Sequence, residues 1–205
     1  MRRIFLDTET TGLKPGQIGQ LSLIREEDSG EISTKNYFFT IDYIEDGAKE
    51  ATGRGVEFYV EASGGKRFVD YSDEILPLVS DGMLVAHNLP FDENFISTEF
   101  WRLDKMFKPL DRFDTMRYFV DKCKLPNTKG GKNKYKNPRL NELVDFLNID
   151  TDKISEYTKQ LFGINSENFH DAMYDTTALF VAFHVWKDEL ESTDNWKKVF
   201  CKNYV

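Results

Sequence analysis

Two acidic side chains near the N-terminus have the spacing of a metal site. Asp7 and Glu9 lie two residues apart in the string FLDTETTGL, residues 5–13. Side chains two apart on a strand point to the same side of the sheet, and paired carboxylates repel unless a cation neutralises them. Oxygen ligands of this kind suit Mg²⁺ or Mn²⁺. A D-x-E pair alone is also compatible with a solvated strand end, but the polar turn that follows favours a ligand site.

A third carboxylate follows a short apolar run in LVAHNLPFDENFI, residues 84–96. The run predicts a buried strand that ends at His87 and Asn88, and Pro90 suits the first turn of a helix. Asp92 then falls within that turn. In the alternative reading, Asp92 only helps to start the helix and His87 is a strand-end histidine satisfied by local hydrogen bonds. Neither alternative accounts for the whole string.

The third string is NFHDAMYDTTALF, residues 168–180, in which His170 and Asp175 are five residues apart. Two helical residues at that spacing do not share a face. The pairing therefore predicts His170 on the loop or first turn and Asp175 one turn inside the helix. In the alternative, Asp171 and Asp175 only decorate a helix N-terminus, where the helix dipole favours acids. The remaining histidine, His184, is spaced with the apolar residues and is expected to be structural.

The elements around these strings follow the order of an α/β domain with a mixed sheet. A short polar connection between the second and third strands implies antiparallel pairing. Residues 42–69 are rich in glycine and are expected to be irregular. Strands are predicted at 2–7, 17–25, 31–41, 83–86 and 112–116, and helices at 70–80, 91–103, 116–124, 139–148 and 171–190.

Composition limits the class of protein. The 205 residues suit one domain, and no apolar run approaches the ~18–20 residues of a membrane-spanning helix. The first residues lack a signal-peptide pattern, and two cysteines are too few for a disulfide framework, so we expect a cytoplasmic protein without membrane association. A net charge of −8 argues against a protein held on nucleic acid by its overall field.

Taken together, the three strings resemble the motifs of the DEDDh exonucleases, a group that includes proofreading subunits of bacterial DNA polymerases, ribonuclease T and oligoribonuclease. The family pattern is D-x-E in the first strand, an acid after H-N-x-x-F, and a late H-x-x-x-x-D, and all five residues are present in order. The resemblance implies a ribonuclease-H-like fold with a five-stranded mixed sheet, three strands antiparallel and the others parallel, flanked by helices. We expect an exonuclease domain over residues 1–190 and a short C-terminal tail over residues 191–205.

The resemblance also implies a mechanism with two divalent cations, Mg²⁺ or Mn²⁺. Asp7 would bridge both ions, Glu9 and Asp175 would help to hold the ion that carries the attacking water, and Asp92 would serve the second ion. His170 is implied as the general base, a task suited to an unperturbed pKa of ~6.5. The implied substrate is a single-stranded DNA or RNA 3′ end, and the implied products are nucleoside 5′-monophosphates.

Substrate contacts are predicted in three places. In the turn after Asp7, Thr8 and Thr10 are expected to meet the terminal nucleotide, and Leu13 either packs on a base or is an ordinary core leucine. His87 and Asn88 are candidates for substrate contact, although ordering the second motif is the favoured role. The segment 122–139 carries seven basic residues and no acid, and with Tyr135 it could grip phosphates and stack a base; otherwise it is a solvated loop. Its candidate contacts are Lys129, Lys132 and Lys134.

Two other roles remain open. The chain could be the proofreading subunit of a DNA polymerase, because the chemistry would be identical; the short predicted tail mildly favours a stand-alone enzyme. It could also be an inactive relative that binds nucleic acid or a partner, although all five motif residues are intact. Segment 42–69 departs from the family pattern, which leaves the rim of the site undefined. Seven of the basic residues are clustered in the segment 122–139. The acidic net charge therefore does not exclude nucleic acid and is compatible with brief binding of a strand end.

Overall fold

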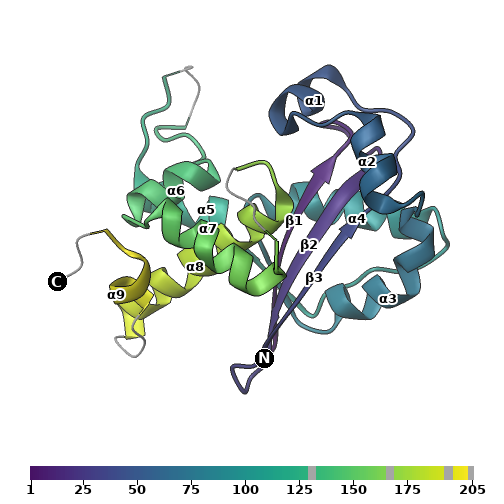
Figure 1. The fold of residues 1–205 in the computed structure, drawn as a ribbon. Coiled ribbons are helices and arrows are strands. Elements are labelled where there is room, and N and C mark those ends of the chain that lie inside the picture. The colour runs from purple at the N-terminus through teal and green to yellow at the C-terminus, as the bar shows by residue number, and fades with distance from the viewer. Residues whose placement is uncertain (129–132, 165–168, 192–195, 203–205) are drawn as a thin grey trace.

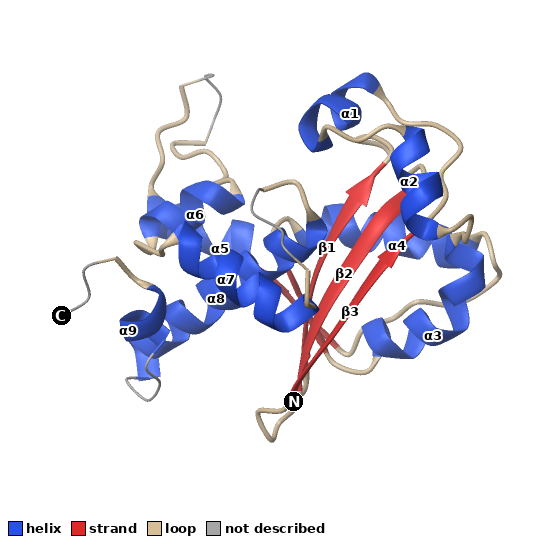
Figure 2. Ribbon diagram, viewed as in Figure 1, coloured by secondary structure: helices blue, strands red, loops and turns tan. Residues whose placement is uncertain are grey.

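The computed structural model describes residues 1–128, 133–164, 169–191 and 196–202. Within them a five-stranded sheet has the order β3-β2-β1-β4-β5 (Figures 1 and 2). β1 pairs antiparallel with β2, which pairs antiparallel with β3, whereas β4 runs parallel to both β1 and β5. The predicted mixed sheet is confirmed. The strands are β1 (Arg3–Thr10), β2 (Ile18–Glu26), β3 (Ile32–Phe38), β4 (Met83–Ala86) and β5 (Asp111–Asp114).

Helices cover both faces of this sheet. The predicted helices are confirmed with small shifts of their ends, as α3 (Phe68–Ser80), α4 (Leu89–Trp101), α5 (Thr115–Cys123), α6 (Leu140–Phe146) and α8 (Ala172–Glu191). The structure adds α7 (Thr151–Phe162) and α9 (Trp196–Phe200), which are not among the predicted helices. None of the described helices is long and apolar enough to cross a membrane.

The expectation that residues 42–69 are irregular is wrong. This segment forms α1 (Asp46–Thr52) and α2 (Val56–Ser63). Each helix ends at a glycine with positive φ, Gly53 at 69° and Gly64 at 58°, a backbone conformation that glycine adopts without steric penalty. Gly53 and Gly64, two of the glycines on which that expectation was based, are the stop signals of two short helices.

Two apolar clusters, one on each face, hold the sheet between the helices. In β1, Phe5 packs into the cluster formed with α6, α7 and α8, whereas Ile4 and Leu6 pack into the cluster on the side of α3 and α4. Because side chains alternate along a strand, the residues that continue the Phe5 side are Asp7 and Glu9. The fold therefore directs both acids toward the face that α8 covers.

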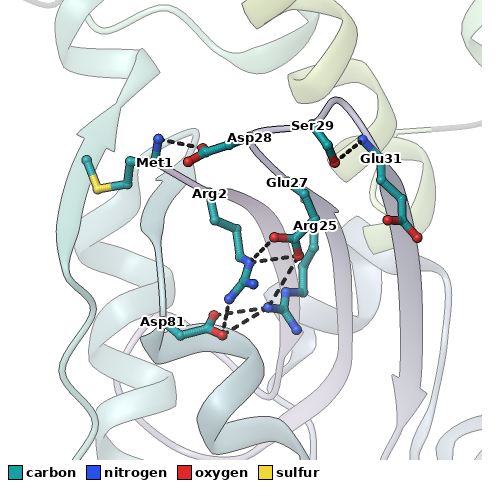
Figure 3. A network of polar contacts seen from close by, with 8 residues as sticks. All are labelled: Met1, Arg2, Arg25, Glu27, Asp28, Ser29, Glu31 and Asp81. Carbon is teal, nitrogen blue, oxygen red and sulfur yellow. Dashed lines mark hydrogen bonds and ion pairs between the residues drawn. The ribbon is translucent and has the colours of Figure 1, made fainter.

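The opposite end of β1 is fixed by ion pairs (Figure 3). Arg2 contacts both Glu27 and Asp81, and Arg25 bonds Asp81 at 3.1 Å, so the ends of β1 and β2 are tied to the residue that follows α3. Such exposed pairs contribute little to stability individually, typically about 0–1 kcal/mol. Their position leaves the other end of the sheet for the acidic strings.

The described part of the predicted C-terminal tail packs on the domain. Trp196 stacks on His184 of α8 with ring centres 4.6 Å apart, and the backbone N–H of Asp150 donates to the Phe200 carbonyl at 2.7 Å. His184 is buried and bonds Glu26 at 3.2 Å, as expected for a structural histidine.

Candidate active site

The carboxylates of Asp7, Glu9 and Asp175 converge at one end of the sheet. Asp7 and Glu9 come from the last residues of β1, and Asp175 lies in the first turn of α8. One carboxylate oxygen of each residue lies within 4.8 Å of those of the other two. Residues that are 168 positions apart in the chain are thus placed around a single point.

Burial and mutual repulsion make it energetically unfavourable for all three carboxyl groups to be ionised together. Burial raises the pKa of Glu9 to about 8 and that of Asp175 to about 7, and nearby carboxylates add to both effects. The same causes hold the pKa of Asp7 well above its ordinary range. Asp175 Oδ1 is buried without a hydrogen-bond partner among the described residues. An orphaned buried oxygen within a group of hard oxygen donors fits a divalent cation as the missing partner.

A fourth carboxylate lies beside the cluster and is held separately. Asp92, in the first turn of α4, is buried, and its Oδ1 accepts hydrogen bonds from the Thr8 backbone N–H at 3.1 Å and the Thr8 hydroxyl at 2.7 Å. Burial raises the pKa of Asp92 to about 7. Asp92 does not belong to the compact three-residue group, which is compatible with the separate role expected for it.

His170 lies two residues before the first residue of α8 and lines the cavity that contains the carboxylates. Its φ is +71°, an uncommon value for a residue with a side chain, and its backbone N–H donates to Asp175 Oδ2 at 2.9 Å. The side chain is exposed and lines the same cavity as Asp7, Glu9 and Asp175. The expected placement of His170 outside the helix and of Asp175 one turn inside it is confirmed.

The cavity over the carboxylates measures about 450 Å³. One wall is the turn after β1 together with α1, and the other includes Phe91 and Leu140, the first residue of α6. Leu13 lies on its rim and is 85% exposed, so it is not a core leucine. The Thr10 hydroxyl donates to the Gly12 carbonyl at 3.0 Å, which shapes the turn.

The other predicted substrate contacts have protein partners. The His87 ring nitrogens lie 3.0 Å from the Thr115 hydroxyl and 2.9 Å from the Pro138 carbonyl, and burial lowers the pKa of His87. Asn88 has a φ of +75°, and its backbone N–H donates to Asp114 at 3.2 Å. These contacts order the second motif and anchor the end of the basic segment. Direct substrate contact by either residue stays a prediction.

Part of the basic segment is described. Tyr135 pairs with Pro126 in an antiparallel bridge, and the Lys136 N–H donates to the Leu125 carbonyl at 2.9 Å, so two chain stretches run side by side. The Lys134 ammonium lies 5.2 Å from the Tyr135 ring centre. The predicted contacts Lys129 and Lys132 lie outside the described residues.

Sequence reasoning missed the contribution of α1 and its neighbours. Ala48, Ala51 and Thr52 line the cavity, and Arg54 ion-pairs with Asp171 next to His170. Reading Gly53 and Gly64 as helix ends would have revealed α1 and α2. No local pattern identifies the Arg54 pair, because its partners are 117 residues apart.

Comparison with known proteins places this arrangement in a family. The RNase_T model, described as exonuclease, matches residues 4–183. The chain is 34% identical over 108 residues to DNA polymerase III subunit epsilon of Rickettsia conorii, covering 48% of this chain and 44% of that protein. It is 32% identical over 117 residues to 3′-5′ exonuclease DinG of Staphylococcus epidermidis, covering 56% of this chain and 13% of that protein. These matches span less than half of each relative.

Solved structures share the fold. E. coli exonuclease I in complex with a dA16 oligonucleotide superposes with a TM-score of 0.63 and 17% identity, covering 91% of this chain and 40% of that one. Exonuclease X in complex with 5′ overhanging duplex DNA gives a TM-score of 0.61 and 17% identity, covering 94% of both chains. Because the family model spans well over half of the sequence, the chain belongs to the RNase_T exonuclease family, within the DEDDh superfamily of 3′–5′ exonucleases.

Proposed function

We propose that this protein is a metal-dependent 3′–5′ exonuclease that hydrolyses phosphodiester bonds at single-stranded nucleic-acid ends and releases nucleoside 5′-monophosphates. The observation that carries the proposal is the group of three carboxylates from β1 and α8, with oxygens within 4.8 Å of one another and raised pKa values, in a cavity that the exposed His170 also lines. Burial and mutual repulsion raise the pKa values of these carboxylates, and a bound cation would relieve the repulsion between their charged forms.

Asp7, Glu9 and Asp175 would hold a divalent cation, Mg²⁺ or Mn²⁺, and Asp92 would serve a second one. Bound cations at such a site would lower the pKa of a bound water and neutralise charge on the phosphate oxygens. The chain itself orients these ligands. The two Thr8 hydrogen bonds to Asp92 Oδ1 fix one carboxylate, and the His170 N–H bond to Asp175 Oδ2 fixes another.

His170 is the proposed general base. Its ring is exposed in the cavity next to the carboxylates, so an imidazole nitrogen can accept a proton from a water that lies over the cluster. The exposed position also allows the proton to leave to solvent after the reaction.

The terminal nucleotide would lie in the cavity between the Thr10–Leu13 turn and α1. Leu13 is exposed on the rim and offers an apolar surface for a base, and the basic segment near Leu140 offers cations for the following phosphates. Support comes from E. coli exonuclease I, which shares the fold and whose structure contains a dA16 oligonucleotide.

A second candidate role is proofreading beside a polymerase, favoured by the identity to DNA polymerase III subunit epsilon. The site chemistry would be the same and only the partner would differ. Co-purification of the tagged chain with the replicative polymerase subunit of its own cell tests this role. Recovery of that subunit in a stable complex supports it, and migration of the two as separate species at micromolar concentration rules it out.

The activity is tested with a digestion panel of single-stranded DNA, single-stranded RNA, duplex DNA and a dinucleotide. With a 5′ label, a 3′–5′ exonuclease yields a ladder of shortened labelled products, whereas a 5′–3′ enzyme releases the label at once. Product masses should correspond to nucleoside 5′-monophosphates. EDTA should stop the reaction, and excess Mg²⁺ or Mn²⁺ should restore it. A label released as a mononucleotide, or digestion that continues in EDTA, contradicts the proposal.

A further inference from the structure

Arg54 lies in the connection between α1 and α2 and reaches across to the start of α8. Its Nη2 is 2.5 Å from Asp171 Oδ2, and its Nη1 donates to Gln20 Oε1 at 2.8 Å. The guanidinium carbon lies 4.7 Å from the centre of the Phe58 ring. The Arg54 side chain is only 18% exposed and that of Asp171 13%. Arg54 is therefore held in one orientation by groups from three elements.

Asp171 is fixed as completely as its partner. Its Oδ1 accepts from the Met173 backbone N–H at 3.0 Å, which caps the first turn of α8, and from Gln20 Nε2 at 3.2 Å. Its other oxygen is the one that Arg54 binds, and its carbonyl accepts from the Asp175 N–H at 2.9 Å. Both carboxylate oxygens have partners, so the pair sets the orientation of the peptide that joins Asp171 to His170.

His170 depends on that peptide. Its φ of +71° is unfavourable for a residue with a side chain and persists only where the surroundings enforce it. Two contacts do so: its own N–H bond to Asp175, and the fixed backbone of Asp171. Without the second contact the residue could relax toward negative φ, and its ring would leave the cavity that it lines together with the carboxylates.

We propose that Arg54 is a positioning residue, which holds the His170 imidazole over the carboxylate cluster through its ion pair with Asp171. The expected loss of kcat rests on the proposed function, whereas the expected change in the position of His170 does not. Arg54 also belongs to the segment with α1, whose Ala48 and Thr52 wall the cavity. One guanidinium thus couples the wall that faces the substrate to the loop that carries the proposed base.

Two substitutions separate this role from simple packing. Arg54→Lys keeps a positive charge and most of the aliphatic stem but removes the fork that binds Asp171 and Gln20 together. Asp171→Asn keeps the oxygen that caps α8 and removes the charge. The control is Arg67→Met, which breaks the exposed ion pair between Arg67 and Asp42. Neither residue lines the cavity.

The first readout is independent of activity. The chain has three histidines, so the ring resonances of His87, His170 and His184 can be resolved by NMR in the metal-free protein. In both variants the His170 signal should shift or broaden while those of His87 and His184 stay in place. Unchanged His170 resonances in both variants would overturn the proposal, whether or not the wild-type protein digests nucleic acid.

The second readout is kinetic. Loss of a group that orients a reacting residue typically costs about 10–100-fold, so kcat should fall by that factor in both variants, with KM within about twofold. In Arg54→Lys, Mn²⁺ affinity measured by calorimetry should stay within about threefold of the wild type, because the variant keeps the positive charge, Asp171 and the proposed metal ligands. A loss of Mn²⁺ affinity that matches the loss of kcat would assign Arg54 to the metal site and overturn the proposal.

Failure of the two claims can be told apart. If wild-type protein has no exonuclease activity but its His170 resonance responds to Arg54→Lys, the proposed function fails and the positioning role stands. If the wild type is active and Arg54→Lys behaves like Arg67→Met in both readouts, the positioning role fails and the proposed function stands. Unfolding of Arg54→Lys would be detected by circular dichroism, and Asp171→Asn then decides the outcome.

Discussion

Neutralising one acid of the cluster should stabilise the metal-free protein, and the gain should depend on pH. The change is Glu9→Gln, which keeps the shape of the side chain and removes its charge. Glu9 is 8% exposed, and burial together with Asp175 raises its pKa from the ordinary 4.5 to about 8. Between these two pH values the folded protein holds a proton that the unfolded chain has released, so the stability of the metal-free wild type falls as pH rises.

The size of the effect follows from the same pKa. At about 1.4 kcal/mol per pH unit, the interval from 4.5 to about 8 corresponds to at most about 5 kcal/mol lost above pH 8. Protonation of Asp7 and Asp175 relieves part of the same repulsion, so we expect Glu9→Gln to recover about 1–3 kcal/mol at pH 8.5. For a chain of this length that corresponds to a Tm higher by about 3–10 °C. At pH 4.5 the two proteins should melt together.

The assay is thermal unfolding in EDTA, followed by circular dichroism at pH 4.5, 6.5 and 8.5. Glu50→Gln, a change on the exposed surface of α1, is the matched control and should leave Tm unchanged at each pH. Saturating Mn²⁺ should reverse the order at pH 8.5, because the wild type gains binding free energy that the variant has partly lost.

The reasoning would be refuted if Glu9→Gln lowered the Tm in EDTA at pH 8.5. A gain of the same size at pH 4.5 and 8.5 would be equally damaging, because it would show that shape and not charge decides the stability of the site.

Three further predictions concern the surroundings of the cluster. Thr8→Val removes the hydroxyl that donates to Asp92 Oδ1 at 2.7 Å, and kcat should fall by about 10–100-fold with little change in KM, measured by steady-state digestion. Leu13→Ala should raise KM by about 5- to 10-fold, because the base loses an apolar surface, and leave Tm unchanged because the side chain is 85% exposed; an equal Tm loss would place Leu13 in the core. Lys134→Ala should weaken binding of an oligonucleotide and reduce the slope of log affinity against log salt by about 1; an unchanged slope would exclude a phosphate contact at Lys134.

The parts of the site that depend on local rules could be predicted from the sequence. Period-two alternation placed Asp7 and Glu9 on one face of β1, and the five-residue spacing placed His170 outside the helix that holds Asp175. Apolar spacing located five helices because each buries apolar residues in one of the two clusters that flank the sheet. These features require only the geometry of a single strand or helix.

The parts that depend on distant contacts could not be predicted. The bond from the Thr8 hydroxyl to Asp92 joins residues 84 positions apart, and the Arg54 pair with Asp171 joins residues 117 apart. No spacing rule relates such residues, because the fold alone brings them together. α1 was missed for another reason: it buries none of its residues, so it has no apolar period to detect.

The most direct test of the central claim is the digestion rate of a 5′-labelled single-stranded oligonucleotide by wild type and Asp7→Asn protein in Mg²⁺, with the folded state of both checked by circular dichroism. Asp7 belongs to the carboxylate group, and loss of cation-based stabilisation worth several kcal/mol should slow 3′-end shortening by at least about 10³-fold. A folded Asp7→Asn protein that produces the same ladder at a rate near that of the wild type would contradict the account.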